Sequence, residues 1–234
     1  MGMKTNKKKT VLYVCLIFFC SIASSLITFL ILKKGNNTNY YKENILKVVE
    51  VASYEEVESK SYGSGWFLDE TTIVTNYHVI SYLISGNRES FSNIEIRFYN
   101  NDKYEKVTLL KFNEEKDVAF LNYSGHYNHS FFSGHDNNIY NSQKCFCIGN
   151  FSNYGLSYKE GYISLDAIKL LYNDNYAIFI QCSISIGQGD SGAPVFNENN
   201  EVIGMITFRT KGSTGTVEQC FAYAIPIDRI LAES

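Results

Sequence analysis

The segment Gly187-Gln-Gly-Asp-Ser-Gly-Ala-Pro-Val-Phe196 decides how the rest of the chain is interpreted. Its serine, Ser191, is flanked by glycines, which let the backbone take a tight conformation that directs N–H groups toward one point. The N–H groups of Gly189 and Ser191 can there hold an oxygen that becomes negative during attack on a carbonyl. A serine becomes a nucleophile only beside a base and a group that orients the base. The segment needs such partners, because turns of this kind also occur by chance.

Two earlier positions supply the partners. His78 follows an apolar run, and Asp117 opens another. Taken singly, His78 is equally consistent with a core histidine and Asp117 with a turn residue. The order His78, Asp117, Ser191 is that of the chymotrypsin fold, whereas Ala193 breaks the Gly-x-Ser-x-Gly pattern of the α/β-hydrolases. Together the three positions predict a Ser-His-Asp triad.

The residues around these positions resemble the trypsin-like peptidases, specifically the bacterial high-temperature-requirement and staphylococcal glutamyl-endopeptidase branches. The resemblance runs from about Gly63 to Leu231. It is carried by Gly63-Ser-Gly-Trp-Phe-Leu68, Thr75-Asn-Tyr-His-Val79, Lys116-Asp-Val-Ala-Phe-Leu121, Glu201-Val-Ile-Gly-Met-Ile-Thr207 and Phe221-Ala-Tyr-Ala-Ile-Pro226. It implies an all-β fold of two six-stranded antiparallel β-barrels with the site in the cleft between them. It also implies cleavage of peptide bonds without a metal or an organic cofactor.

Three departures from the family pattern change the expectations. No Ile-Val-Gly-Gly-like segment precedes His78, so activation by freeing a new amino terminus is not expected. Asp190 stands where relatives place the acid that receives this terminus, and we expect it to hydrogen-bond locally instead. The sequence reaches Ser234 soon after the similarity ends, and no PDZ module is expected.

By the same resemblance, Ser185, Thr207 and Arg209 line the substrate pocket. An aspartate at position 185 would predict cleavage after Lys or Arg, and it is missing. Ile206 stands where the glutamyl enzymes carry a histidine. Arg209 could supply positive charge for an acidic side chain, or it could point outward or narrow the pocket. We expect a small apolar or an acidic residue before the cut.

The N-terminal part has the pattern of a membrane anchor. Residues 11–32 contain no charged residue, and at ~1.5 Å per residue a helix of that length crosses a bilayer core. Lysines are in excess before it, which favours that side as cytoplasmic. A cleavable signal peptide ending near Ala23 and a buried soluble helix are the alternatives. The predicted organisation is a cytoplasmic tail (1–10), a transmembrane helix (11–32), a linker (33–44) and an extracytoplasmic peptidase domain (45–234) bound by protein or peptide substrates.

Composition agrees with a packed β domain. Hydrophobic residues make up 45% of the chain, and the net charge of -3 gives no sign of nucleic-acid binding. Short runs of β-branched and aromatic residues between polar turns predict strands. These runs are 71–75, 94–98, 106–112, 117–121, 144–148, 177–184, 201–208 and 220–225. The region 42–60 fits a helix or a first strand, and 227–233 fits a closing helix.

The cysteines leave alternatives open. Cys145 and Cys147 alternate on a predicted strand, so both face one side and should not bond each other. Cys182 with Cys220 is the most plausible disulfide, while all four could equally be small buried apolar residues. The loop 122–138 carries three histidines without an acidic or cysteine partner at ligand spacing, which favours ordinary loop residues over a zinc site.

Overall fold

The structure is a computed structural model that describes residues 13, 17–25, 39–54, 60–81, 93–209 and 221–234. They fall into two units, residues 1–39 and residues 40–234. In the first unit, residues 17–25 are helical. No helix in the described part of the chain has both the length and the apolar character needed to span a bilayer. Most of the predicted span 11–32 lies outside the described residues.

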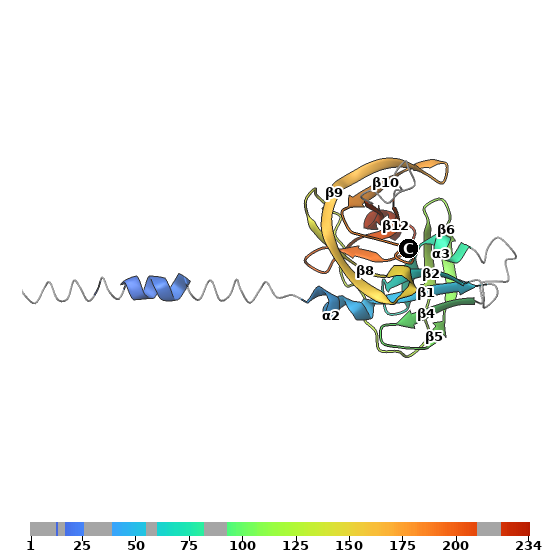
Figure 1. Cartoon of the computed structure of the whole chain (residues 1–234), viewed down its shortest axis with the longest axis horizontal. Helices are drawn as coiled ribbons and strands as arrows, with labels where there is room; N and C mark the ends of the chain where they lie inside the picture. The colour runs from blue at the N-terminus through green and yellow to red at the C-terminus, as the bar shows by residue number, and fades with distance from the viewer. Residues whose placement is uncertain (1–12, 14–16, 26–38, 55–59, 82–92, 210–220) are drawn as a thin grey trace, which may run out of the picture. The chain divides into compact units, whose positions relative to one another are not determined.

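The first half of the larger unit is one antiparallel sheet of seven strands in the order β5-β4-β1-β2-β3-β7-β6 (Figure 1). The strands are β1 (Val48–Tyr54), β2 (Lys60–Phe67), β3 (Thr72–Thr75), β4 (Ile94–Phe98), β5 (Tyr104–Lys106), β6 (Thr108–Asn113) and β7 (Val118–Asn122). Only Val107 separates β5 from β6, so one run of chain forms both edges of the sheet and bends it back on itself. In place of the first predicted six-stranded barrel the structure has a seven-stranded sheet, and the predicted run 106–112 is divided at Val107.

The second half is a closed barrel of six strands, as predicted, in the order β10-β13-β12-β11-β8-β9. The strands are β8 (Lys144–Asn150), β9 (Leu156–Tyr172), β10 (Asn175–Cys182), β11 (Pro194–Phe196), β12 (Val202–Arg209) and β13 (Ala222–Pro226). With 17 residues, β9 pairs with β8 along its first part and with β10 along its last part. It is the long curved strand in Figure 1, and this length brings its end to the first half of the unit.

Short helices occur between and around the strands. They are α2 (Tyr40–Asn44), η1 (Ile45–Lys47), α3 (Tyr77–Ile80), η4 (Phe151–Asn153) and α4 (Ile227–Leu231). The closing helix is thus confirmed as α4, and the region that fitted a helix or a strand contains both, with η1 leading directly into β1. Tyr40 stacks on Phe146 with ring centroids 4.1 Å apart, so the compact unit begins at α2.

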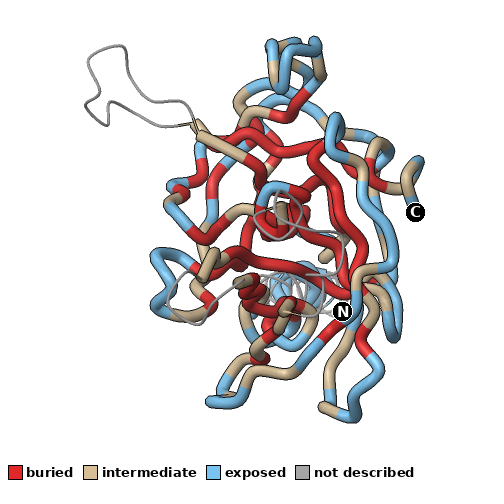
Figure 2. Tube along the Cα trace, turned by 90° about the vertical axis from the view of Figure 1, so that its right-hand side faces the viewer, coloured by how far each residue is buried: buried red, intermediate tan, exposed pale blue. Residues whose placement is uncertain are grey.

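Buried apolar side chains fill both halves, as the red inner segments of Figure 2 show. In β4 the burial alternates residue by residue, which is the pattern of a strand with one face on the core. Fully buried residues such as Ile94 and Ile96 each contribute about 1.5–3 kcal/mol relative to exposure. This rigid packing positions the loops that carry the polar residues.

The cysteines are part of this core. Cys145, Cys147 and Cys182 carry free thiols and are buried. A hydrogen bond with the Cys145 sulfur, together with burial, raises the pKa of Cys182. Cys182 therefore packs as a small buried apolar residue beside Cys145, and its pairing with Cys220 stays a prediction. Cys220 itself lies outside the described residues.

The loop with the three histidines packs by stacking and hydrogen bonds. His129 stacks on Phe67 with centroids 3.9 Å apart, and its ring nitrogens lie 2.9 Å from the carbonyl oxygens of Tyr127 and Glu70. Among the described residues, no group of three His, Cys, Asp or Glu side chains is arranged to hold a metal ion.

Candidate active site

His78 and Asp117 meet at the first half of the unit. His78 lies in α3, directly after β3, and Asp117 lies in the turn before β7 with a φ of 54°. Nδ1 of His78 is 2.8 Å from Oδ2 of Asp117, and the His78 N–H donates to Oδ1 at 2.9 Å. Asp117 is 1% exposed, whereas the His78 side chain is 41% exposed. The carboxylate is therefore fixed and buried, while the imidazole has an open face.

Two hydroxyl groups from the second half also reach Asp117. Thr207 in β12 donates from Oγ1 to Oδ2 at 2.5 Å. Tyr172 at the end of β9 donates to the same oxygen at 2.8 Å. The side chain of Thr207, which was predicted to line the substrate pocket, thus points to Asp117. Tyr172 was not predicted from the sequence, because no local motif marks a hydroxyl that arrives from another strand.

Thr207 also connects Ser191 to these residues. Its Oγ donates to the carbonyl oxygen of Thr207 at 3.1 Å. Its own carbonyl oxygen accepts from the N–H of Ser64 at 2.8 Å, which ties the serine to β2 of the first half. Thr207 therefore contacts both Asp117 and Ser191. Within the described residues, the Ser191 hydroxyl makes no hydrogen bond to His78, so this rotamer is turned toward β12.

The loop before Ser191 is held in one conformation. The carbonyl oxygen of Gln188 accepts from the Ser152 N–H at 2.7 Å, and Ser64 Oγ donates to the carbonyl of Gly189 at 2.8 Å. In a trans peptide the C=O of Gln188 and the N–H of Gly189 point in opposite directions, so the N–H points away from Ser152. In the described part of the chain, neither the Gly189 N–H nor the Ser191 N–H donates a hydrogen bond, which leaves both available to a ligand.

Gly189 has no substitute in this loop. Its φ of 91° is a left-handed conformation that favours glycine, and a Cβ there would collide with the carbonyl oxygen of Asn150. The glycine-rich sequence was therefore a correct guide to the backbone of this turn.

Asp190 has a cation as its partner. Nζ of Lys159 in β9 lies 2.6 Å from Oδ1, and the Gly187 N–H donates to Oδ2 at 2.8 Å. The Asp190 side chain is 0% exposed and that of Lys159 is 12% exposed. A buried carboxylate of this kind requires a charged or hydrogen-bonding partner. Asp190 thus bonds locally to Gly187, as expected, and also to Lys159, 31 positions earlier in the chain, which was not predicted.

The other predicted pocket residues lie apart from this network. Ser185 is exposed in the loop after β10. Arg209 is partly buried at the end of β12 and donates from Nη1 to the carbonyl oxygen of Ile186 at 3.3 Å. Its guanidinium thus lies beside the loop that carries Ser185. The segment 210–220 that follows is outside the described residues.

Comparison with known proteins gives curated relatives named as DegP-like serine endoproteases. A probable periplasmic serine endoprotease, DegP-like, from Pseudomonas savastanoi pv. phaseolicola is 30% identical over 175 residues, which cover 73% of this chain and 33% of the relative. The protein of the same name from Rickettsia conorii is 32% identical over 163 residues, covering 65% and 30%. The chain thus spans about a third of the length of these curated relatives.

The fold is shared with solved structures of the same type. The HtrA-type protease AlgW with tripeptide superposes with a TM-score of 0.69 at 22% identity, covering 83% of this chain and 60% of that chain. A model of the trypsin-like peptidase domain matches residues 63–205, which is more than half of the chain. The chain therefore belongs to the family of trypsin-like peptidases, and these curated relatives are named DegP-like.

Proposed function

We propose that this chain is a serine endopeptidase that hydrolyses peptide bonds through His78, Asp117 and Ser191. The observation that carries the proposal is the contact chain from His78 to Asp117, from Asp117 to Thr207, and from Thr207 to Ser191. Family membership supports it, as do the names of relatives, which are serine endoproteases. No step of the proposed reaction uses a metal or an organic cofactor.

In the proposed mechanism, the Ser191 side chain first rotates from the Thr207 carbonyl toward His78. His78 takes the hydroxyl proton as Ser191 attacks the peptide carbonyl, and gives it to the leaving amine when the peptide bond breaks. Asp117 orients His78 and stabilises its charged form. The N–H groups of Gly189 and Ser191 hold the oxyanion. A water molecule then releases the acyl group, with His78 as base, and restores the serine.

The rotamer of Ser191 favours a second candidate. A catalytically silent peptide-binding module on the same fold needs no hydrogen bond between serine and histidine, and the Ser191 hydroxyl donates to Thr207 instead. In free enzymes such catalytic hydrogen bonds are often long or absent and form only with substrate bound. The two candidates make opposite predictions for a covalent probe.

A fluorophosphonate probe separates them. We expect the full chain to be labelled, because the probe reacts only with an activated serine, and we expect Ser191→Ala to abolish labelling while the fold is kept. Ser124→Ala is the matched control, since Ser124 is exposed in the loop between the two halves. Wild-type protein that is folded but not labelled would support the silent module.

The substrate preference is proposed to be a small apolar or an acidic residue before the cut. Two observations support this preference. Position 185 carries a serine and not an acidic residue, and the Arg209 guanidinium bonds to Ile186, the residue after Ser185. Cleavage sites in a proteome-derived peptide library should reveal it, and Arg209→Gln should selectively reduce cleavage after Glu and Asp. Efficient cleavage after Lys or Arg alone would contradict the proposal.

We also propose that residues 11–32 anchor the chain in a membrane with the peptidase domain outside the cytoplasm. The uncharged run and the preceding lysines support this topology, and the curated relatives are named periplasmic. The full chain should resist extraction by alkaline carbonate. Arginines at Ile22 and Leu26 should release it, because each costs about 2.5–3.5 kcal/mol at the centre of a membrane helix. Extraction of the unmodified chain would contradict the anchor.

A further inference from the structure

Tyr172 makes a contact with Asp117 that neither the family match nor the sequence motifs assign. Its hydroxyl donates to Oδ2 of Asp117 at 2.8 Å and lies 3.4 Å from Oγ1 of Thr207. Oδ2 also lies 2.8 Å from Nδ1 of His78. The phenol therefore bonds to the same carboxylate oxygen that the histidine uses.

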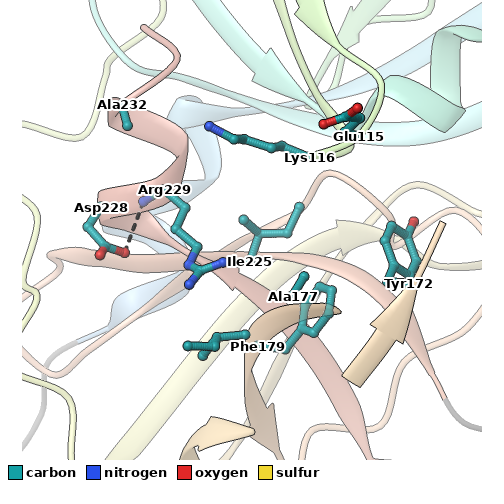
Figure 3. A pocket seen from close by; sticks show the side chains of 10 residues that line it. Glu115, Lys116, Tyr172, Ala177, Phe179, Ile225, Asp228, Arg229 and Ala232 are labelled. Carbon is teal, nitrogen blue, oxygen red and sulfur yellow. Dashed lines mark hydrogen bonds between the residues drawn. The ribbon is translucent and has the colours of Figure 1, made fainter. Parts of the chain in front are cut away.

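Neighbouring aromatic rings hold the ring of Tyr172 in the position from which its hydroxyl reaches Asp117. It stacks on Phe208, the residue after Thr207, with centroids 5.1 Å apart, and meets Phe179 edge-on at 5.5 Å. On another side the ring lines a pocket of about 330 Å³. Figure 3 shows the phenol oxygen directed toward the Glu115–Lys116 segment, which runs into Asp117. The ring stack and the hydroxyl bonds therefore fix the ring where close packing is incomplete.

We propose that Tyr172 is a positioning residue that acts on the proposed peptidase reaction through Asp117. The hydroxyl dipole places its positive end on the carboxylate. It fixes the plane of the carboxylate and offsets part of the negative potential that Asp117 exerts on His78. Less negative potential favours the neutral imidazole, which is the form that accepts a proton from Ser191.

The hydroxyl is a donor throughout the neutral range. Burial first, and then the charge of Asp117, raises the pKa of Tyr172, so the proton is retained well above pH 10. Other ionisable groups surround the site from several elements. They are Tyr77 in α3, Glu115 and Lys116 in the turn, and Asp228 and Arg229 in α4. Tyr172 and His78 are the ionisable residues that bond directly to the Asp117 carboxylate among those described.

The proposal rests on the proposed function, so the first measurement is one that needs no activity. The titration of the His78 ring is followed by NMR in full-length Ser191→Ala protein with isotope-labelled histidine. The chain has only four histidines, so their signals are few. Adding Tyr172→Phe keeps the ring and removes the donor. The midpoint of the His78 titration should move to higher pH. Tyr176→Phe is the matched control, because Tyr176 is exposed on the same hairpin and should leave the midpoint unchanged.

A second background separates electrostatics from packing. In Asp117→Asn protein, Tyr172→Phe should not change the His78 titration, because the negative charge that the hydroxyl offsets is gone. An unchanged midpoint in the Ser191→Ala background, a downward shift, or an equal shift in the Asp117→Asn background would overturn the proposal. These titrations test the role of Tyr172 whether or not the protein cleaves peptides.

In the active protein, Tyr172→Phe should lower kcat about three- to tenfold with KM nearly unchanged, as expected for loss of one hydrogen bond of ordinary strength while Thr207 still donates to the carboxylate. The acidic limb of the kcat/KM profile should move to higher pH, so the loss is larger at pH 6 than at pH 8. A higher KM with unchanged kcat would show a merely structural role. So would an equal loss of kcat/KM at every pH, without movement of the acidic limb. If wild-type protein shows no turnover, the proposed function fails while the titration still decides the role of Tyr172.

Discussion

Two buried aspartates lie beside the candidate reacting groups, and the groups that bond to them differ in kind. Asp117 accepts hydrogen bonds from two hydroxyls and lies against an imidazole, and among the described residues no lysine or arginine bonds to it. Asp190 forms a buried ion pair with the ammonium of Lys159. The charge of Asp117 is therefore left for the imidazolium that forms during reaction, while the charge of Asp190 is cancelled and holds a loop.

The difference assigns two kinds of role to the same side chain. A carboxylate that serves the transition state must keep most of its negative potential toward His78, and hydroxyl donors orient it while offsetting only part of that potential. A carboxylate that serves structure is best paired with a fixed cation, because a buried unpaired charge is very costly. Substitutions at the two sites should therefore have different effects on activity and on stability.

The largest effect is expected from Asp117→Asn. The amide keeps the size of the side chain but favours the wrong tautomer of His78, which in triads of this class lowers kcat by about 10⁴. Stability should change far less than activity, because no cation is left unpaired. Peptide turnover and urea unfolding of the variant measure the two effects, and Asp102→Asn, at an exposed position, is the control. An equal loss of stability would remove the distinction between the two aspartates.

The second effect is expected from Lys159→Met, which leaves the Asp190 carboxylate buried without its cation. Removing one partner of a buried ion pair costs about 3–5 kcal/mol, and here the destabilised element is the loop of Gly189. Unfolding in urea and labelling by a fluorophosphonate should both show the loss. Lys169→Met, at an exposed position of the same strand, should change neither the stability nor the labelling.

Two further variants test the cause of that loss. Adding Asp190→Asn to Lys159→Met should recover part of the stability, because the unpaired charge disappears. Lys159→Arg should keep more activity than Lys159→Met, because it keeps a cation. Full activity and stability of Lys159→Met would show that the loop is held by its hydrogen bonds to Ser64 and Ser152 alone.

The sequence predicted the residues that local motifs mark. His78 and Asp117 each stand at an end of an apolar run, and Ser191 lies in a glycine-rich turn, so each was found within a few residues of its structural element. Most predicted strands overlap the observed ones, because burial on one face leaves an alternating or apolar pattern. The six-stranded barrel of the second half and the closing helix followed from the same patterns and the family resemblance.

The strand β9 was not predicted, and it provides both unexpected partners. Of its 17 residues only Leu156, Gly161 and Ile163 are buried, and the remainder are half-buried or exposed, so no apolar run marks the strand. Lys159 and Tyr172 lie on this strand, 31 and 55 positions from the aspartates they contact. Such contacts depend on strand pairing across the barrel, which single-sequence patterns do not specify.

The smallest effect is expected at the outer side of the Asp117 turn. Lys116, the neighbour of Asp117, pairs with Glu233 after α4, and the Asn113 amide donates to the same carboxylate at 2.9 Å. The hydrogen bond from Lys116, followed by that from Asn113, lowers the pKa of Glu233. Lys116 is 49% exposed, so the pair should contribute no more than about 1 kcal/mol.

The pH dependence of Glu233→Gln tests this pair. A folded-state pKa below the unfolded value stabilises the protein above the unfolded pKa of about 4.3, and the gain is lost as pH falls through the folded pKa. The variant should therefore be slightly less stable than wild type in urea at pH 7 and equally stable at pH 3, with Glu198→Gln, at an exposed position, as the control. Activity should stay within twofold, because the inner donors alone fix Asp117. A large loss of activity would mean that the turn, and not the hydroxyls of Thr207 and Tyr172, holds the carboxylate in place.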